Sequence, residues 1–181
     1  MPIQPFIGKH PQFDASVFIA ENATLIGDVT LGAQSSLWFN AVVRGDVHRI
    51  RIGARTNIQD LCMVHVTHGT APTTIGDDVT VGHSAVLHGC TIEDRVLIGM
   101  SALVMDHAVI GHDSIVGAKA LVTGRTVIPP RSLVLGAPAR VVRELTGEEV
   151  AFVKQSALNY VRYRAIYLGE EQPERNPYYN D

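Results

Sequence analysis

An aliphatic residue recurs every six positions along most of this chain. Gly or a polar residue follows most of these aliphatics, and small residues recur four positions after them. Six residues are enough for one short strand and a turn, but too few for a helical repeat. The pattern therefore predicts an all-β solenoid whose aliphatic side chains point inward. The register is Ile58, Val64, Ile75, Val81, Leu87, Ile92, Ile98, Val104, Ile110, Val116, Val122, Ile128 and Val134.

Three such units are expected to close one triangular coil of about 18 residues. No unit can bury its apolar face alone, so successive coils must stack. Two insertions interrupt the spacing of six: Val43 to Ile52 is nine residues, and Val64 to Ile75 is eleven. Repeat proteins place such insertions on one surface, which is often the functional one.

The pattern changes after Pro138. Thr146 followed by Glu149 is typical of a capping box, and apolar residues then recur at helical spacing. We therefore expect a solenoid domain over 1–142 and a C-terminal helix within 143–168 that packs on the solenoid or on a neighbouring subunit. We expect a poorly anchored, flexible tail over 169–181. The expected apolar positions of the helix are Val150, Val153, Ala157, Tyr160, Val161 and Leu168.

Three histidines fall at informative places in this repeat. His65 and His88 are one coil apart once the longer insertion is discounted, so they should stack at one outward corner about 4.8 Å apart. Two imidazoles at that spacing can bind one metal ion. Arg44 falls one coil below His65 in the same column.

His83 belongs to a different column and lies about 16 Å from His88 along an extended chain. It would have to reach a metal held by the other two histidines from a neighbouring chain, as in a threefold ring. The spacing alone leaves two alternatives open: a shared metal site, or histidines that only pack between subunits.

Composition excludes several classes of protein. The chain has 181 residues and a formal net charge of −3, so no basic surface indicates nucleic acid or an anionic membrane. Its apolar runs are too short to cross a bilayer, and its start does not resemble a signal peptide. A cytoplasmic protein without nucleic-acid or membrane partners is expected. Cys62 and Cys90 are too few for a disulfide framework and are predicted to be buried packing residues.

Several segments together resemble the γ-class carbonic anhydrase family, and the resemblance covers nearly the whole chain. It implies a left-handed parallel β-helix of hexapeptide repeats with a C-terminal α-helix, assembled as a homotrimer with metal at the subunit interfaces. The left hand comes from the resemblance alone, because ordinary β crossovers are right-handed. The segments are Val43-Arg44-Gly45-Asp46, Asn57-Ile58-Gln59-Asp60, Met63-Val64-His65, and Val81-Gly82-His83 through His88-Gly89.

By this resemblance His65, His83 and His88 are the metal ligands, two from one chain and one from the next. The metal would be zinc, or Fe2+ or Co2+, since a set of three histidines does not identify its ion. Gln59 would hold the metal-bound water or a substrate oxygen.

Four further residues match positions beside the family's site. Arg44 and Asp46 resemble an interface pair, the alternative being a salt bridge of little energetic value. Asp60 shares the column of His83 and would orient that ring or satisfy a turn. Tyr160 resembles an aromatic residue near the site, the alternative being ordinary helix packing.

The chain also departs from the family's archetype. Val47 stands where the archetype has a glutamate, and the loop Val66 to Pro72 contains no acidic residue. The proton shuttle of the family is therefore missing, and His68 is the candidate substitute.

The leading hypothesis is a lyase in which a metal-bound hydroxide hydrates CO2 to bicarbonate, with weak activity. Two alternatives share the fold: a hydrolase of coenzyme A thioesters or a hexapeptide acyltransferase, and a non-catalytic trimeric scaffold.

Overall fold

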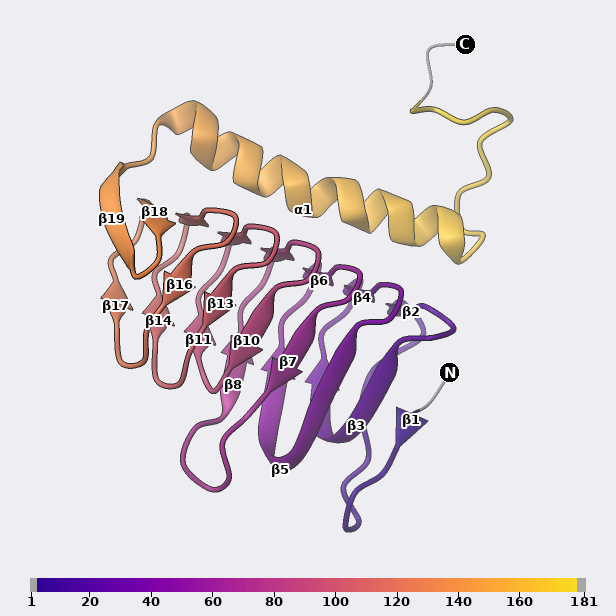
Figure 1. Cartoon of the computed structure of the whole chain (residues 1–181). Helices are drawn as coiled ribbons and strands as arrows, with labels where there is room; N and C mark the ends of the chain where they lie inside the picture. The colour runs from indigo at the N-terminus through magenta and orange to yellow at the C-terminus, as the bar shows by residue number, and fades with distance from the viewer. Residues whose placement is uncertain (1–2, 179–181) are drawn as a thin grey trace.

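The chain forms a parallel β-solenoid with one long helix lying along it (Figure 1), in a computed structural model that describes residues 3–178. Strands one coil apart pair in parallel, as Ile98 does with Val116 and Val104 with Val122. The repeat aliphatics from Ile58 to Val134 are at most 3% exposed, so they form the interior column that the spacing predicts.

The strands form two sheets, and the larger sheet bends around a corner to supply two faces of the coil. Its members are β1 (Ile3–Gln4), β3 (Thr24–Leu31), β5 (Val42–Ile52), β7 (Met63–His65), β8 (Thr73–Ile75), β10 (Val86–His88), β11 (Thr91–Ile92), β13 (Leu103–Val104), β14 (Val109–Ile110), β16 (Leu121–Val122) and β17 (Val127–Ile128). The third face contains β2 (Phe18–Ile19), β4 (Ser36–Leu37), β6 (Asn57–Ile58), β9 (Thr80–Val81), β12 (Leu97–Ile98), β15 (Ile115–Val116), β18 (Ser132–Gly136) and β19 (Ala139–Glu144).

Both insertions lie at one corner of the solenoid. The start of β5 pairs with β7, and its end pairs with β8, so β5 crosses this corner without a break. The second insertion leaves the same corner between β7 and β8, and the Gly69 N–H donates to the Val47 carbonyl at 3.4 Å. The prediction that the insertions share one surface is confirmed.

The end of the solenoid differs from the simple repeat. β19 runs antiparallel to β18 and extends to Glu144, so the last strand doubles back over the final coil. The solenoid therefore ends two residues later than the expected boundary at 142. A turn at Gly136 to Pro138 reverses the chain, and the parallel pairing stops there.

Helix α1 (Gly147–Tyr167) starts at the expected capping box and ends one residue earlier than expected. The Thr146 hydroxyl accepts from the Glu149 N–H at 3.2 Å, and the Glu149 carboxylate accepts from the Thr146 N–H at 2.9 Å. Val153 and Ala157 are buried against the solenoid, as predicted. Leu168, predicted on the apolar face, is instead 39% exposed because it caps the end of the helix.

The described part of the tail contacts α1, whereas the sequence predicts a poorly anchored segment. Arg164 pairs with Glu170 and Arg162 with Glu171, each at 2.6 Å. The ring of Tyr178 packs 5.0 Å from that of Tyr163. Two acidic residues of the tail, Glu170 and Glu171, therefore bind arginines of the helix. Residues 179–181 lie outside the described part of the chain.

Two further expectations concern the interior and the membrane. Cys62 and Cys90 are buried and unpaired, as predicted, and burial raises the pKa of each thiol to about 12. Over residues 3–178, no helix combines the length and the apolar character that crossing a bilayer requires.

Candidate metal centre

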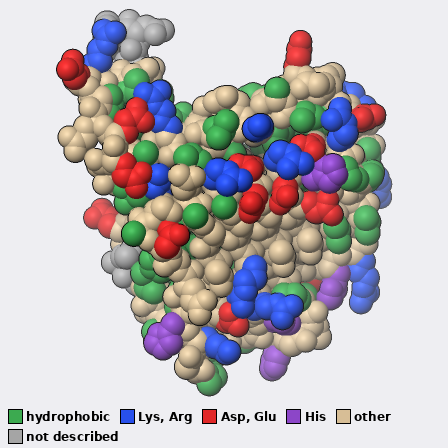
Figure 2. Space-filling model, turned by 180° about the vertical axis from the view of Figure 1, so that it is seen from behind, with side chains coloured by type: hydrophobic (Ala, Val, Ile, Leu, Met, Phe, Trp, Pro, Cys, Tyr) green, Lys and Arg blue, Asp and Glu red, His purple; other side chains and the backbone are tan. Residues whose placement is uncertain are grey.

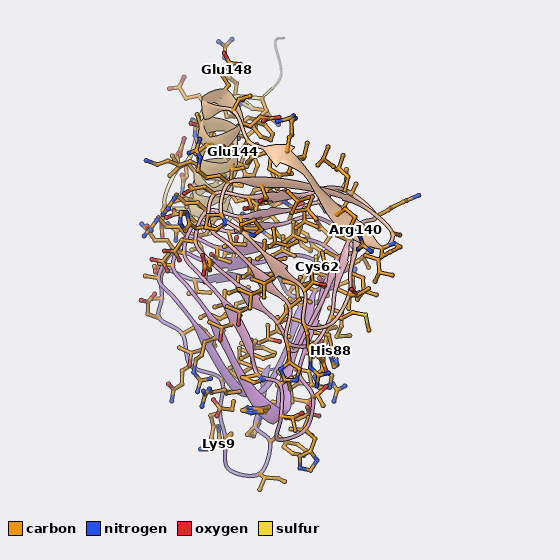
Figure 3. All side chains as sticks on the ribbon, turned by 90° about the vertical axis from the view of Figure 1, so that its left-hand side faces the viewer. Lys9, Cys62, His88, Arg140, Glu144 and Glu148 are labelled. Carbon is orange, nitrogen blue, oxygen red and sulfur yellow. The ribbon has the colours of Figure 1, made fainter. Side chains whose placement is uncertain are left out.

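His65 and His88 stack at the corner that carries the two insertions. They end β7 and β10 and are partners in the parallel register between these strands. Their ring centroids are 5.3 Å apart, with an angle of 78° between the ring planes. In Figure 3, which looks along the solenoid, His88 lies at a corner of the coils and Cys62 lies further inside. The column count thus predicts the observed stacking of these two rings.

Each of these two rings is held through its Nδ1 atom. His65 Nδ1 donates to the carbonyl oxygen of Arg44 at 2.6 Å, and His88 Nδ1 lies 2.5 Å from Asp106 Oδ1. A proton held on Nδ1 leaves the lone pair on Nε2, which is the nitrogen that can bind a metal. The pair therefore fits a divalent metal in donor type, stacking and ring orientation.

His83 lies elsewhere, after β9, with a side chain that is 45% exposed. Its Nδ1 is 2.8 Å from Asp60 Oδ2, and its backbone N–H donates to Gln59 Oε1 at 3.2 Å. Gln59 is buried, and its Nε2 donates to Asn57 Oδ1 at 3.1 Å. Within residues 3–178, no three His, Cys, Asp or Glu side chains of one chain gather closely enough to hold a metal.

Arg44 and Asp46 form an ion pair below the stacked histidines, with Arg44 Nη1 2.5 Å from Asp46 Oδ2. Burial raises the pKa of the Asp46 carboxyl, but the Arg44 guanidinium outweighs this effect and holds the pKa below its usual range. Asp46 Oδ1 is 3.9 Å from His65 Nδ1. The pair therefore places a negative charge near the first histidine of the stack.

Tyr160 belongs both to the helix packing and to the surroundings of His83. Its ring meets that of Trp38 edge-on at 5.3 Å. It also lines a groove of about 500 Å3, together with Gln59 and His83, between α1 and the smaller sheet. Burial, with a smaller contribution from the charge of Asp60, raises the pKa of Tyr160 to about 12. The phenol is therefore neutral at physiological pH.

Asp106 was not among the residues singled out from the sequence. Its Oδ1 contacts His88, and its Oδ2 accepts from Thr67 Oγ1 at 2.5 Å. Burial raises its pKa, but the hydrogen bonds from Thr67 and His88 outweigh burial and lower it. The available signal was spacing, because Asp106 follows His88 by 18 residues, one full coil.

Comparisons with known proteins indicate the family of the chain. Residues 89–124 match the family model described as bacterial transferase hexapeptide (six repeats). A Methanocaldococcus jannaschii protein named "Probable carbonic anhydrase" is 58% identical over 147 residues, which are 81% of this chain and 92% of that protein. "Gamma carbonic anhydrase 2, mitochondrial" of Arabidopsis thaliana is 46% identical over 90% of this chain, and the match spans 60% of the plant protein.

A crystal structure from Bacillus cereus shares the fold, and its name assigns it provisionally to the acetyltransferases. It has a TM-score of 0.90 and 42% identity, and the match covers 93% of this chain and 98% of that one. The fold is therefore the expected left-handed parallel β-helix with a C-terminal helix. The extent of these identities shows that the chain belongs to the γ-class carbonic anhydrase family of hexapeptide-repeat proteins.

Proposed function

We propose that this chain is a carbonic anhydrase-type lyase that hydrates CO2 to bicarbonate as a homotrimer with a metal at each subunit interface. The observation that carries the proposal is the stacked pair His65 and His88, each with Nδ1 held by an oxygen acceptor. Zinc, Fe2+ and Co2+ all accept imidazole ligands, so the ion itself is left to metal analysis.

The third ligand is His83 of the next subunit. Two facts support this assignment: His83 lies on a different corner from the stacked pair, and its half-exposed ring has a carboxylate at Nδ1. A threefold ring brings this corner of one chain against the metal corner of the next and repeats the contact three times.

A divalent metal held by His65, His88 and the His83 of the next subunit would supply Lewis acidity and would make water at the site more acidic. The chain itself supplies orientation. Gln59 holds the backbone of His83, and Asp60 faces its ring, so these two residues set the direction of the third ligand. Arg44 fixes His65 through its carbonyl group and Asp46 through its guanidinium.

Transfer of the reaction's proton from the site to solvent is the slow step. Histidine is the one residue type in the loop Val66 to Pro72 that exchanges protons near neutral pH, and His68 is exposed there. Without an acidic shuttle, the rate depends on His68 and on buffer. We therefore infer slow CO2 hydration that rises with buffer concentration, measured by stopped flow.

Subunit mixing tests the interface site. Two variants are needed: a double variant, His65→Ala with His88→Ala in one chain, and a single variant, His83→Ala. Each alone should bind little metal and hydrate little CO2. When the two are unfolded and refolded together, each mixed trimer regains one intact interface, or about one third of its sites. If all three ligands acted within one chain, mixing would restore neither metal nor activity.

A second candidate is hydrolysis of coenzyme A thioesters at the same site. The groove that starts at Gln59 and His83 continues past Leu97 and Ile115, so it offers an apolar surface to an acyl chain. The Bacillus cereus structure is also named for acyl transfer. Parallel assays of CO2 hydration and acetyl-coenzyme A cleavage, with zinc- and iron-loaded protein, separate the two. Inactivity in both with metal bound would favour a scaffold.

A further inference from the structure

The carboxylate of Asp106 joins a predicted metal ligand to the longer insertion. One oxygen contacts His88 Nδ1, and the other accepts a hydrogen bond from the hydroxyl of Thr67, both at 2.5 Å. Thr67 opens the insertion, and its N–H donates to the Ala71 carbonyl at 3.1 Å. The carboxylate therefore lies between the end of β10 and the base of the loop.

The backbone at Gly89 leaves space for this carboxylate. Gly89 has a φ of +57°. A Cβ at this position would approach Asp106 Oδ1 to 2.6 Å and the Cβ of Ala71 to 2.7 Å. The Gly89 carbonyl also accepts from the N–H of His107 at 2.7 Å. The loop, the residue after β10 and the turn after β13 thus border Asp106, whose side chain stays 34% exposed, so packing on one side adds to its hydrogen bonds.

The two stacked histidines differ in what holds them. His65 is held by the backbone carbonyl of Arg44, which the sheet itself fixes. His88 is held by a side chain, and that side chain depends in turn on Thr67. A ligand oriented by a carboxylate has a fixed tautomer and a more basic ring.

We infer that Asp106 is a positioning residue that orients His88 and, through Thr67, couples metal retention to the order of the loop Val66 to Pro72. The inference rests on the proposed function, because it requires His88 to bind a metal. It assigns the loop a role other than proton transfer.

The first experiment measures zinc release from the loaded full-length protein to a chromophoric chelator. Asp106→Ala should release zinc about 10–100-fold faster, the usual effect of removing a residue that orients a metal ligand. Thr67→Val should accelerate release about fivefold, as expected for one lost hydrogen bond. Thr70→Val, at an exposed position of the same loop, is the matched control and should leave the rate unchanged.

Asp106→Asn separates hydrogen bonding from charge. Its amide can accept from His88 and donate to Thr67, so it should keep both contacts and restore most of the slow release. If Asp106→Ala fails to fold, Thr67→Val still tests the inference, because it removes the hydrogen bond to Asp106 and leaves the carboxylate in place.

Amide hydrogen exchange of residues 67–71 is the second measurement. Exchange should rise in Asp106→Ala and Thr67→Val, both with zinc and after its removal, and stay unchanged in Thr70→Val. If Asp106→Ala or Thr67→Val holds zinc and releases it at the unmodified rate, the inference is wrong and the proposed metal site stands. If the unmodified protein binds no zinc, Fe2+ or Co2+, both are wrong.

Discussion

Two corners of the solenoid differ in the side chains that stack from coil to coil. Arginines alternate with aspartates at the corner between β17 and β18 and at the equivalent corners of the other coils, whereas two histidines, His65 and His88, stack at the insertion corner. Arg55 donates to both oxygens of Asp78 at 2.7 Å, and Arg95 donates to both oxygens of Asp113 at 2.7 and 3.0 Å. Figure 2 shows acidic and basic side chains gathered in a band across the solenoid. We call the corner between β17 and β18, with its equivalents in the other coils, the charged corner. We call the insertion corner, where we propose the metal, the metal corner.

Both corners use the same spacing between coils, but they differ in how many of their side-chain nitrogen and oxygen atoms already have a partner within the chain. At the charged corner, each arginine fork meets a carboxylate of its own chain, so the pairing is complete. At the metal corner, residues 3–178 bind His65 and His88 through Nδ1 alone, so Nε2 of each ring is available to the metal that we propose. The first corner is a structural element, and the second fits a ligand and a partner subunit.

A histidine at the charged corner shows that a histidine–carboxylate pair is not enough. His112 Nδ1 lies 2.7 Å from Asp113 Oδ2, a distance much like that at His88. Asp113 is shared with Arg95, however, and the next coil places Arg131 close by, its N–H donating to the His112 carbonyl. Two stacked histidines, rather than one histidine with its acid, mark the metal corner.

The largest expected contrast comes from one substitution at each corner. His88→Ala should reduce bound metal from about one ion per chain to background and lower CO2 hydration by at least about 100-fold. Arg95→Ala should change neither quantity by more than about twofold. Metal analysis and stopped-flow assays check both. Equal losses in the two variants would contradict the division between corners.

Stability should show the opposite order, with a smaller effect. Arg95→Ala leaves the mostly buried carboxylate of Asp113 with His112 as its remaining side-chain partner and should cost about 1 kcal/mol, a value reduced for the exposure of Arg95. His88→Ala in metal-free protein should cost about 0.5 kcal/mol or less. Urea unfolding at one fixed protein concentration, with chelator present, compares them. A larger loss for His88→Ala would refute this order.

The charged corner should also depend on pH. The hydrogen bond from Arg95 holds the pKa of Asp113 below its usual range, outweighing burial. A lowered folded-state pKa stabilises the protein above the unfolded value of about 3.9, and this stabilisation disappears as pH falls through the lower folded value. Asp113→Asn should therefore be less stable than the unmodified chain at pH 7 and show a smaller loss of stability between pH 5 and pH 2. Parallel acid titrations followed by circular dichroism test this.

The substitutions at the two corners should have their smallest effect on the solenoid interior, which can be followed by the reactivity of its two cysteines. Cys62 and Cys90 have thiol pKa values raised to about 12 by burial, so the folded protein should not react with an aromatic disulfide reagent at pH 8. His88→Ala and Arg95→Ala should be equally unreactive, and unfolding in urea should expose both thiols. If the cysteines of the folded Arg95→Ala chain were labelled, loss of one ion pair at the charged corner would have opened the solenoid interior, and the two corners would not be independent.

The repeat made most of the fold predictable, because a fixed period converts sequence spacing into position. The interior column, the stacking of His65 on His88, the shared insertion corner and the capping box of α1 all follow from spacing and local propensity. The same arithmetic applied to aspartates would have found Asp106 and the Arg95–Asp113 pair, which are also 18 residues apart.

Other features depend on side-chain choices that the period does not determine. The column count places Arg44 below His65, but it does not show that the carbonyl of Arg44, rather than its guanidinium, contacts the ring. The contacts of Glu170 and Glu171 with α1 join segments without a repeat, so no spacing rule predicts them. The roles of Gln59, Asp60 and Tyr160 at an interface depend on a second chain.

β5 crosses the insertion corner without a break. At this corner the loop between β7 and β8 can therefore be lengthened without disturbing the strands. Pairing is retained on both sides of it, with β7 before the corner and β8 after it, so added residues do not shift the register of any other coil. Doubling such a loop costs only about 0.6 kcal/mol in closure entropy. A longer, acid-bearing segment inserted among the exposed residues 68–70 would keep Thr67 and Ala71 in place and leave the scaffold intact, so proton-transfer capacity could be engineered into the protein there.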